Sequence, residues 1–196
     1  MSQETDKQNT TTSSPNDRDA ARWYAFKVFY NKVFDIESHL LKTGIRSYLP
    51  SETITVERGG VRKKERRPLV PSLIFFQCGE RLAEELRGGL EGRVLLYTRE
   101  KNGKKIPSAI PDREMEIFML VTSAGKAGLE YLGEDSPRFR KGEKVRVTGG
   151  QFKGAEGHIC RIKGDRRLIV SIQGLCAVAT SYIPQCYLEK IDDHDQ

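Results

Sequence analysis

Residues 147–162 read VTGGQFKGAEGHICRI, and four glycines fall within nine positions of this stretch. Glycine-rich loops that bind phosphate follow two common patterns: Lys and then Ser or Thr directly after the last glycine, or the spacing G-x-G-x-x-G. Neither pattern is present, and Ala155 stands directly after Gly154. Both motifs also need a helix immediately downstream, whereas GHICRI alternates like a strand. The stretch therefore predicts a tight corner between two β-strands rather than a phosphate site.

The C-terminal part of the sequence predicts a small closed β-barrel. From Phe139 onward, short segments of β-type residues are separated by glycine: KVRVT, GHICRIKG, RLIVSIQG and CAVATSYI. Short strands at near-regular intervals are typical of such barrels. We therefore expect a barrel domain over residues 138–191 and a tail at 192–196. Residues 124–137, rich in glycine and acidic side chains, are expected to form a linker.

The N-terminal part predicts an α+β fold. Residues 1–20 carry almost no apolar side chains and predict a disordered tail. Aromatic and β-branched runs predict strands at 22–30, on both sides of the Gly59-Gly60 dipeptide, at 72–78 and at 93–98. Apolar residues at helical spacing predict helices at 31–44, 79–88 and 112–123. We expect residues 21–123 to form an antiparallel sheet with flanking helices.

The sequence predicts where the first helix ends and which faces of the second and third helices are apolar. Gly44 stands where a left-handed C-terminal cap belongs. In the second helix, Leu82 and Leu86 lie on one side. In the third helix, one face carries Met115, Phe118, Met119 and Thr122.

Composition favours a basic protein without catalytic or metal chemistry. The net charge of +6 favours a polyanionic neighbour such as nucleic acid. The four cysteines form no C-x-x-C pair and the three histidines have no metal-ligand spacing, so we expect no metal, cofactor or disulfide framework. No nucleophile–base pattern or paired carboxylates predict an enzyme. No apolar run approaches the ~20 residues of a membrane span and no secretory signal opens the chain, so we expect a cytoplasmic protein with no membrane partner.

The C-terminal glycine pattern resembles a known motif. Its spacing, V-x-x-G-x-F-x-G-x-x-G-x-I, resembles the KOW motif of NusG-type transcription factors and several ribosomal proteins. Gln151 stands where that family usually has proline. The motif positions are filled by Val147, Gly150, Phe152, Gly154, Gly157 and Ile159.

The N-terminal part resembles the same family. RWYAFKVFYNKVFDIESHLLKTGIRSYLP is similar to the opening strand and helix of the NusG N-terminal (NGN) domain, and RRPLVPSLIFFQC to its basic, apolar and proline-containing stretch. The resemblance runs in order over residues 22–191. It implies an NGN domain at 21–123 and a KOW domain with an SH3-like β-barrel at 138–191. It also implies a transcription elongation or antitermination factor that is not an enzyme.

The resemblance implies an apolar surface that binds the clamp helices of the largest RNA polymerase subunit. Aromatic residues commonly stand where this chain has Val70 and Leu73. The alternative is an ordinary core strand, and both interpretations can hold for opposite faces of the strand. The matching positions are Val70, Pro71, Leu73 and Phe75.

The Gly59-Gly60 hairpin carries a run of basic residues. In the family this domain lies beside upstream DNA and the non-template strand, so we expect phosphate contacts that supply affinity rather than sequence reading. Nascent RNA is a further expected partner, and a merely solvated hairpin is the alternative. The basic residues are Arg58, Arg62, Lys63, Lys64, Arg66 and Arg67.

The barrel departs from the family at one docking position. General NusG proteins recruit Rho or a small-subunit ribosomal protein with a phenylalanine in an S-I-F-G stretch, whereas this chain reads SIQG with Gln173. Losing that ring costs roughly 2–4 kcal/mol of binding, so we expect weakened or lost coupling. This implies a specialised paralogue of the UpxY or RfaH type, acting on a polysaccharide operon. The alternatives are a general NusG factor and a ribosome- or RNA-binding KOW protein.

Overall fold

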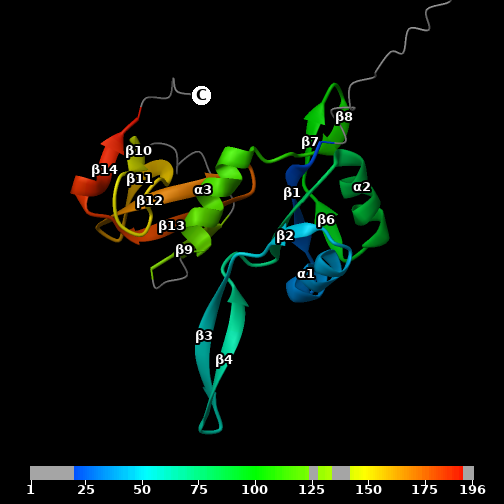
Figure 1. Ribbon diagram of the computed structural model, residues 1–196, viewed down its shortest axis with the longest axis horizontal. Coiled ribbons are helices and arrows are strands. Elements are labelled where there is room, and N and C mark those ends of the chain that lie inside the picture. Colours follow the sequence, from blue (N-terminus) through cyan, green and yellow to red (C-terminus); the bar gives the residue numbers. More distant parts are fainter. Residues whose placement is uncertain (1–19, 124–127, 134–141, 192–196) are drawn as a thin grey trace, which may run out of the picture.

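The computed structural model describes residues 20–123, 128–133 and 142–191 (Figure 1). The predicted tails, apart from residue 20, and most of the predicted linker lie outside these ranges. The N-terminal elements are β1 (Arg22–Val28), α1 (Val33–Lys42), β2 (Arg46–Tyr48), β3 (Ser51–Arg58), β4 (Val61–Pro68), β5 (Leu73–Cys78), α2 (Glu80–Gly89), β6 (Val94–Leu96), β7 (Thr98–Lys101), β8 (Lys104–Pro107) and α3 (Asp112–Ser123). The C-terminal elements are β9 (Glu130–Gly133), β10 (Lys144–Val147), β11 (Glu156–Ile162), β12 (Asp165–Ile172), β13 (Cys176–Tyr182), a short 3-10 helix (Gln185–Tyr187) and β14 (Leu188–Lys190).

The N-terminal elements form the expected α+β arrangement. A four-stranded antiparallel sheet has the order β2-β5-β1-β6, which we call the N-terminal sheet. Side chains alternate across it, so Phe26 and Phe76 stack 4.3 Å apart on one face, in the cluster that α1 and α2 cover. On the other face, Phe75 packs against Phe118 of α3 with ring centroids 5.3 Å apart. Both faces of the central strands are therefore buried, as the unbroken apolar runs predict.

Local sequence features determine the ends and faces of the helices. Gly44 has a φ of 73° and donates to Leu41 O at 3.1 Å, while Ile45 donates to Leu40 O at 3.0 Å. This pair of bonds is a Schellman motif, and it confirms the predicted cap. The prediction for α2 was wrong in one residue: Leu82 is exposed, and the buried side is formed instead by Ala83, Leu86 and Leu90.

Two hairpins extend from the N-terminal part, and only one was predicted. The β3–β4 hairpin turns at Gly59 and Gly60, whose φ angles are 60° and 78°. The β7–β8 hairpin turns at Asn102 and Gly103, both with positive φ. Asn-Gly is a strong sequence signal for such turns, but β7 and β8 are only four residues each.

The C-terminal elements form one six-stranded antiparallel sheet with the order β14-β10-β11-β12-β13-β9, which we call the C-terminal sheet. This is consistent with the expected SH3-like domain. Strand β9 corrects one expectation, because residues 130–133 lie inside the predicted linker yet pair with β13, with Tyr131 opposite Val178. The strand was missed because this segment has the glycine-rich and acidic composition of a linker, and because its partner strand is distant in sequence.

The glycine-rich stretch is the corner that its sequence predicts. Gly154 donates to Val147 O at 2.7 Å, and Val147 donates to Ala155 O at 2.8 Å, which closes the loop. Phe152 is buried beneath it. A Cβ at Gly157 would overlap the Ile169 carbonyl oxygen, so only glycine allows β11 and β12 to approach this closely. Strand β11 follows directly, so no helix N-terminus is available for phosphate.

Helix α3 lies between the two sheets and contributes to one continuous core (Figure 1). Phe118 belongs to the predicted face and packs on the N-terminal sheet. An adjoining stripe of Glu114, Ile117 and Val121 recurs at helical spacing. Glu114 accepts a hydrogen bond from the Gln173 backbone, so this stripe faces the C-terminal sheet. The helix therefore has two buried sides, of which the sequence pattern indicated one.

Candidate functional site

The strand expected to carry an exposed apolar surface is mostly buried. Val70, Leu73 and Phe75 are 0%, 3% and 0% exposed, and they belong to the core shared with α3 and the C-terminal sheet. The expectation of an accessible patch is therefore corrected for these three residues, because α3 covers this face of the N-terminal sheet. Pro71 is exposed. The core-strand interpretation thus holds for both faces of β5.

Pro71 lies in a corner with an unusual backbone. Ser72 has a φ of 59°, and its carbonyl accepts a hydrogen bond from Val28 N at 2.7 Å. Just beyond β1, Tyr30 and Asn31 also have positive φ, at 58° and 55°. Non-glycine residues seldom adopt this region, and such residues cluster at functional sites. Tyr30 is also 82% exposed.

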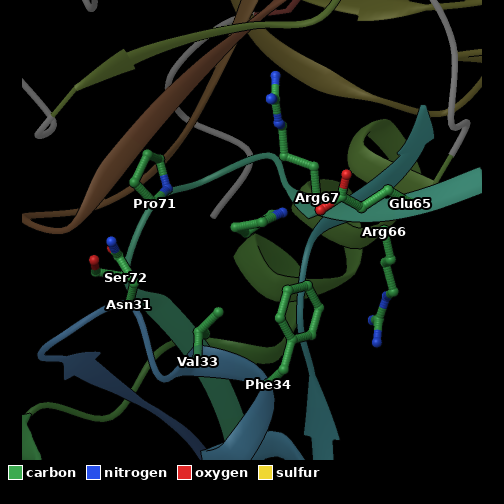
Figure 2. Close-up of a pocket in the computed structure, with 9 residues that line it drawn as sticks. Asn31, Val33, Phe34, Glu65, Arg66, Arg67, Pro71 and Ser72 are labelled. Carbon is green, nitrogen blue, oxygen red and sulfur yellow. The ribbon is translucent and has the colours of Figure 1, made fainter. Parts of the chain in front are cut away.

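A hollow of about 280 Å³ opens beside this corner, at the base of the β3–β4 hairpin (Figure 2). It brings together residues from two sites that the sequence predicted separately, because Arg66 and Arg67 meet Pro71 there. Figure 2 shows Arg66 and Arg67 pointing to opposite sides, as successive strand residues must. The hollow is lined by Asn31, Val33, Phe34, Glu65, Arg66, Arg67, Pro68, Pro71 and Ser72.

Arg66 is held by partners within the protein. Its guanidinium makes two hydrogen bonds to the Glu37 carboxylate, at 2.6 and 2.9 Å, and a third to Ser51 Oγ at 2.7 Å. It also lies over the Phe34 ring, 5.3 Å from the centroid. This bidentate pair fixes the hairpin base against α1, so we assign Arg66 a structural role.

The other basic residues lie along the exposed β3–β4 hairpin, residues 51–68, which we call the arm (Figure 1). Arg58 lies 3.7 Å from Glu65 and Arg62 3.3 Å from Glu57, and both arginines are highly exposed. Exposed pairs of this kind contribute little energy and exchange easily. Within the described residues, no acidic group lies within ion-pair distance of Lys63, Lys64 or Arg67. The arm therefore presents three uncompensated cations to solvent.

Gln173 lies at the end of the C-terminal sheet that contacts α3. Its backbone N–H donates to Glu114 Oε2 at 3.1 Å, while the residue stays exposed. Nearby, Glu156 accepts from Arg113 of α3 and from Arg146 of β10, each at 2.9 Å. Burial raises the pKa of Glu156, but the two arginines outweigh this effect and hold the pKa below its usual value. Charged hydrogen bonds therefore join α3 to this sheet.

The KOW-type positions shape the corner and carry no reactive group. Val147 and Phe152 are buried, Ile159 is half-buried, and Gly150 and Gly154 have positive φ. The residues that the structure describes include no cluster of His, Cys, Asp and Glu able to hold a metal ion. Burial raises the pKa of the Cys78 thiol to about 11, so it stays protonated at neutral pH. No described helix is long and apolar enough to cross a membrane.

Comparisons with known proteins identify the family. The family model described as "Transcription termination factor nusG" matches residues 21–119, which is half of the chain. The chain therefore belongs to the NusG family. A solved structure titled "Domain interaction in Thermotoga maritima NusG" is 21% identical, with a TM-score of 0.43, over 88% of this chain and 98% of that chain. A comparison with curated proteins found no match.

Family membership determines the general class of function. NusG proteins are transcription factors that act in elongation and antitermination, and their general partner is RNA polymerase. Membership of this family points to a non-enzymatic transcription factor.

Proposed function

We propose that this chain is an antitermination factor that binds the clamp helices of the largest RNA polymerase subunit and keeps polymerase processive on a polysaccharide biosynthesis operon. The observation that carries the polymerase interface is the corner at the hairpin base, where exposed Pro71 and Arg67 line one hollow. The exposed Tyr30 directly precedes Asn31, which lines the same hollow. An apolar contact with a charged rim is the usual composition of a protein interface.

The burial of the β5 side chains changes which residues make this contact. Val70, Leu73 and Phe75 reach a partner only if α3 moves away from the N-terminal sheet. Pro71 and Tyr30 are accessible as the protein stands. We therefore assign the first contact to Pro71 and Tyr30, and a supporting role to the buried strand behind them.

The exposed arm supplies the nucleic-acid contact in this proposal. Lys63, Lys64 and Arg67 form no ion pair with another described residue, whereas Arg58 and Arg62 each form one. Upstream or non-template DNA is the proposed ligand, with nascent RNA as a further one. Contacts to phosphate of this kind position the protein and do not read sequence.

The specialised role rests on Gln173. This residue is exposed beside α3 and offers an amide where coupling factors present a ring. We propose that Rho and ribosomal-protein binding is weak, that residues 21–123 form the NGN unit, and that β9 joins the KOW unit expected at 138–191. The cytoplasm is the proposed location.

Binding of the full chain to purified core RNA polymerase tests the polymerase interface. Pro71→Glu and Tyr30→Glu should each weaken binding by about tenfold, because a desolvated apolar contact becomes a buried charge. Leu41→Glu is the matched control, since Leu41 is also exposed but lies on α1 away from the corner. Equal binding by all three variants would show that Pro71 and Tyr30 do not contact the polymerase.

A gain-of-function variant tests the specialised role. Gln173→Phe should increase capture of Rho or of the ribosomal protein, whereas the natural chain should capture little. Mapping where the protein travels with polymerase should place it on a polysaccharide gene cluster. Strong Rho capture by the natural chain, with genome-wide occupancy, would indicate a general NusG factor instead.

A further inference from the structure

A second hollow, of about 580 Å³, is lined by residues of β10, β11, β12 and β14 in the C-terminal sheet. Strands β11 and β12 are antiparallel, and Glu156 at the start of β11 contacts Arg113 of α3. Arg161 lies five positions further along β11, roughly 17 Å away at the usual rise of a strand. The arginine end of the hollow therefore lies at the opposite end of β11 from the contact between Glu156 and α3. It is lined by Gly142, Glu143, Val145, Ile159, Arg161, Arg166, Gln185, Leu188 and Lys190.

The floor of this hollow is aliphatic. Val145 belongs to the buried core, and Ile159 and Leu188 are partly buried and pack against that core. None of the described residues that line the hollow is aromatic. An aliphatic floor accepts an aliphatic side chain, whereas single-stranded nucleic acid is usually held by stacking on aromatic rings.

The rim carries two arginines that face each other. Arg161 stands directly opposite Arg166 in the β11–β12 register. Like charges in this position repel and destabilise a sheet. Arg166 Nη1 donates to the neutral Gln185 Oε1 at 2.6 Å, which does not offset the charge.

The one acidic group in the hollow is already paired. Glu143 lies 2.7 Å from Lys190 Nζ. Across the described part of the chain, no carboxylate lies within ion-pair distance of Arg161 or Arg166. Among the described residues, the hollow therefore combines two guanidiniums that form no ion pair with an apolar floor.

We propose that this hollow binds a short acidic peptide segment of a partner protein, in which a Leu- or Ile-type side chain is flanked by carboxylates. The aliphatic side chain fills the floor over Ile159 and Leu188. The carboxylates bind Arg161 and Arg166, since the planar guanidinium matches a carboxylate with two parallel hydrogen bonds. Binding relieves the repulsion between the two arginines, so the site gains more from an anion than two separated arginines would.

Nuclear magnetic resonance titration of the full, isotope-labelled chain tests the site. The probe is a capped heptapeptide of sequence GDLEELG, and its neutral analogue GNLQQLG and the serine analogue GDSEESG are controls. We expect saturable shifts of the amides around Val145, Ile159 and Leu188 with the acidic aliphatic peptide, and at least about fivefold weaker binding of either analogue. Absence of saturable shifts with GDLEELG would overturn the proposal.

Two substitutions separate a ligand site from a structural feature. Arg161→Gln combined with Arg166→Gln should weaken peptide binding at least about tenfold, while Arg81→Gln, at an exposed arginine on α2, should not. The double variant should also have an unchanged or higher Tm, because it removes like-charge repulsion. Undiminished binding by the double variant, or a Tm lowered by several degrees, would contradict the proposal.

Oligouridine of seven nucleotides provides the remaining comparison. The peptide should bind more tightly than this RNA at the same ionic strength, because the hollow has no stacking platform. Tighter binding of oligouridine at Arg161 and Arg166 would identify the hollow as an RNA contact and overturn the assignment to a peptide.

Discussion

The Tyr48 hydroxyl lies 2.7 Å from Thr122 Oγ1, and this bond joins β2 to the last turn of α3. Thr122 is buried, and its own proton is donated to the Phe118 carbonyl at 2.7 Å. Tyr48 is therefore the donor in the bond between the two side chains. Burial raises the pKa of Tyr48, so the donor keeps its proton throughout the physiological range. The Tyr48–Thr122 hydrogen bond and the Phe75–Phe118 contact therefore both hold helix α3 against the N-terminal sheet.

Removing the Tyr48 hydroxyl should loosen this attachment. We expect Tyr48→Phe to lower the free energy of unfolding by about 1 kcal/mol, the usual net value of one hydrogen bond. Urea denaturation measures this difference. Tyr182→Phe serves as the control, because Tyr182 is an exposed tyrosine of β13. If both variants lose equal stability, the Tyr48–Thr122 bond contributes nothing specific.

Glu156 should make the free energy of unfolding depend on pH. Its pKa is lowered in the folded state, so its contribution is present above the unfolded value of about 4.3 and is lost as pH falls through the folded value. We expect Glu156→Gln to cost about 1–2 kcal/mol at pH 7, since two charge-assisted hydrogen bonds become neutral ones. The difference between natural protein and variant should shrink as pH falls below about 5.

Glu116 offers the control for this pH dependence. It lies 3.9 Å from Arg113 but is largely exposed, so Glu116→Gln should change stability by less than about 0.5 kcal/mol at any pH. Urea titrations at several pH values compare the variants. A constant difference between the natural protein and Glu156→Gln down to pH 2 would show that the ionised Glu156 is not the group responsible.

Replacing Gly157 or Gly88 by alanine should change the stability of the protein in opposite directions. Gly157→Ala should destabilise the protein by about 2–4 kcal/mol, because the new methyl group overlaps the Ile169 carbonyl and forces β11 and β12 apart. Gly88 lies in α2 with open space around it. Gly88→Ala should therefore stabilise by about 0.5–1 kcal/mol through helix propensity. Thermal denaturation of both variants provides the comparison, and a stable Gly157→Ala protein would refute the close-approach argument.

Local signals in the sequence predicted most of the elements but neither the short strands β8 and β9 nor the assembly of the elements. Gly44 and the Gly59-Gly60 pair act through their own φ angles, so their roles were predictable. The second buried side of α3 was not, because Ile117 and Val121 are covered by a sheet distant in sequence. The same packing buries Val70 and Phe75, which the sequence could assign equally well to a surface.

Sites formed by several segments were the least predictable. The hollow at the hairpin base combines Asn31, Arg66 and Pro71, and no spacing within one segment indicates that they meet. The opposed arginines of the second hollow depend on the β11–β12 register, which sets Arg161 opposite Arg166 across a turn. A lysine-and-arginine count shows the charge but not which cations lack a partner.

The exposed arm should account for part of the salt dependence of DNA binding. Each phosphate contact to a single strand contributes a slope of about −0.7 in log K against log salt concentration. Lys63→Gln, Lys64→Gln and Arg67→Gln together should reduce the magnitude of the slope by about 2 and weaken binding about equally across sequences. The β7–β8 hairpin gives a control, because Lys104→Gln with Lys105→Gln removes two exposed cations from the other two-stranded hairpin, and the slopes are compared per cation removed. Fluorescence anisotropy with single-stranded DNA at several salt concentrations measures the slopes, and equal slopes for the arm and control variants would leave only overall charge as the explanation.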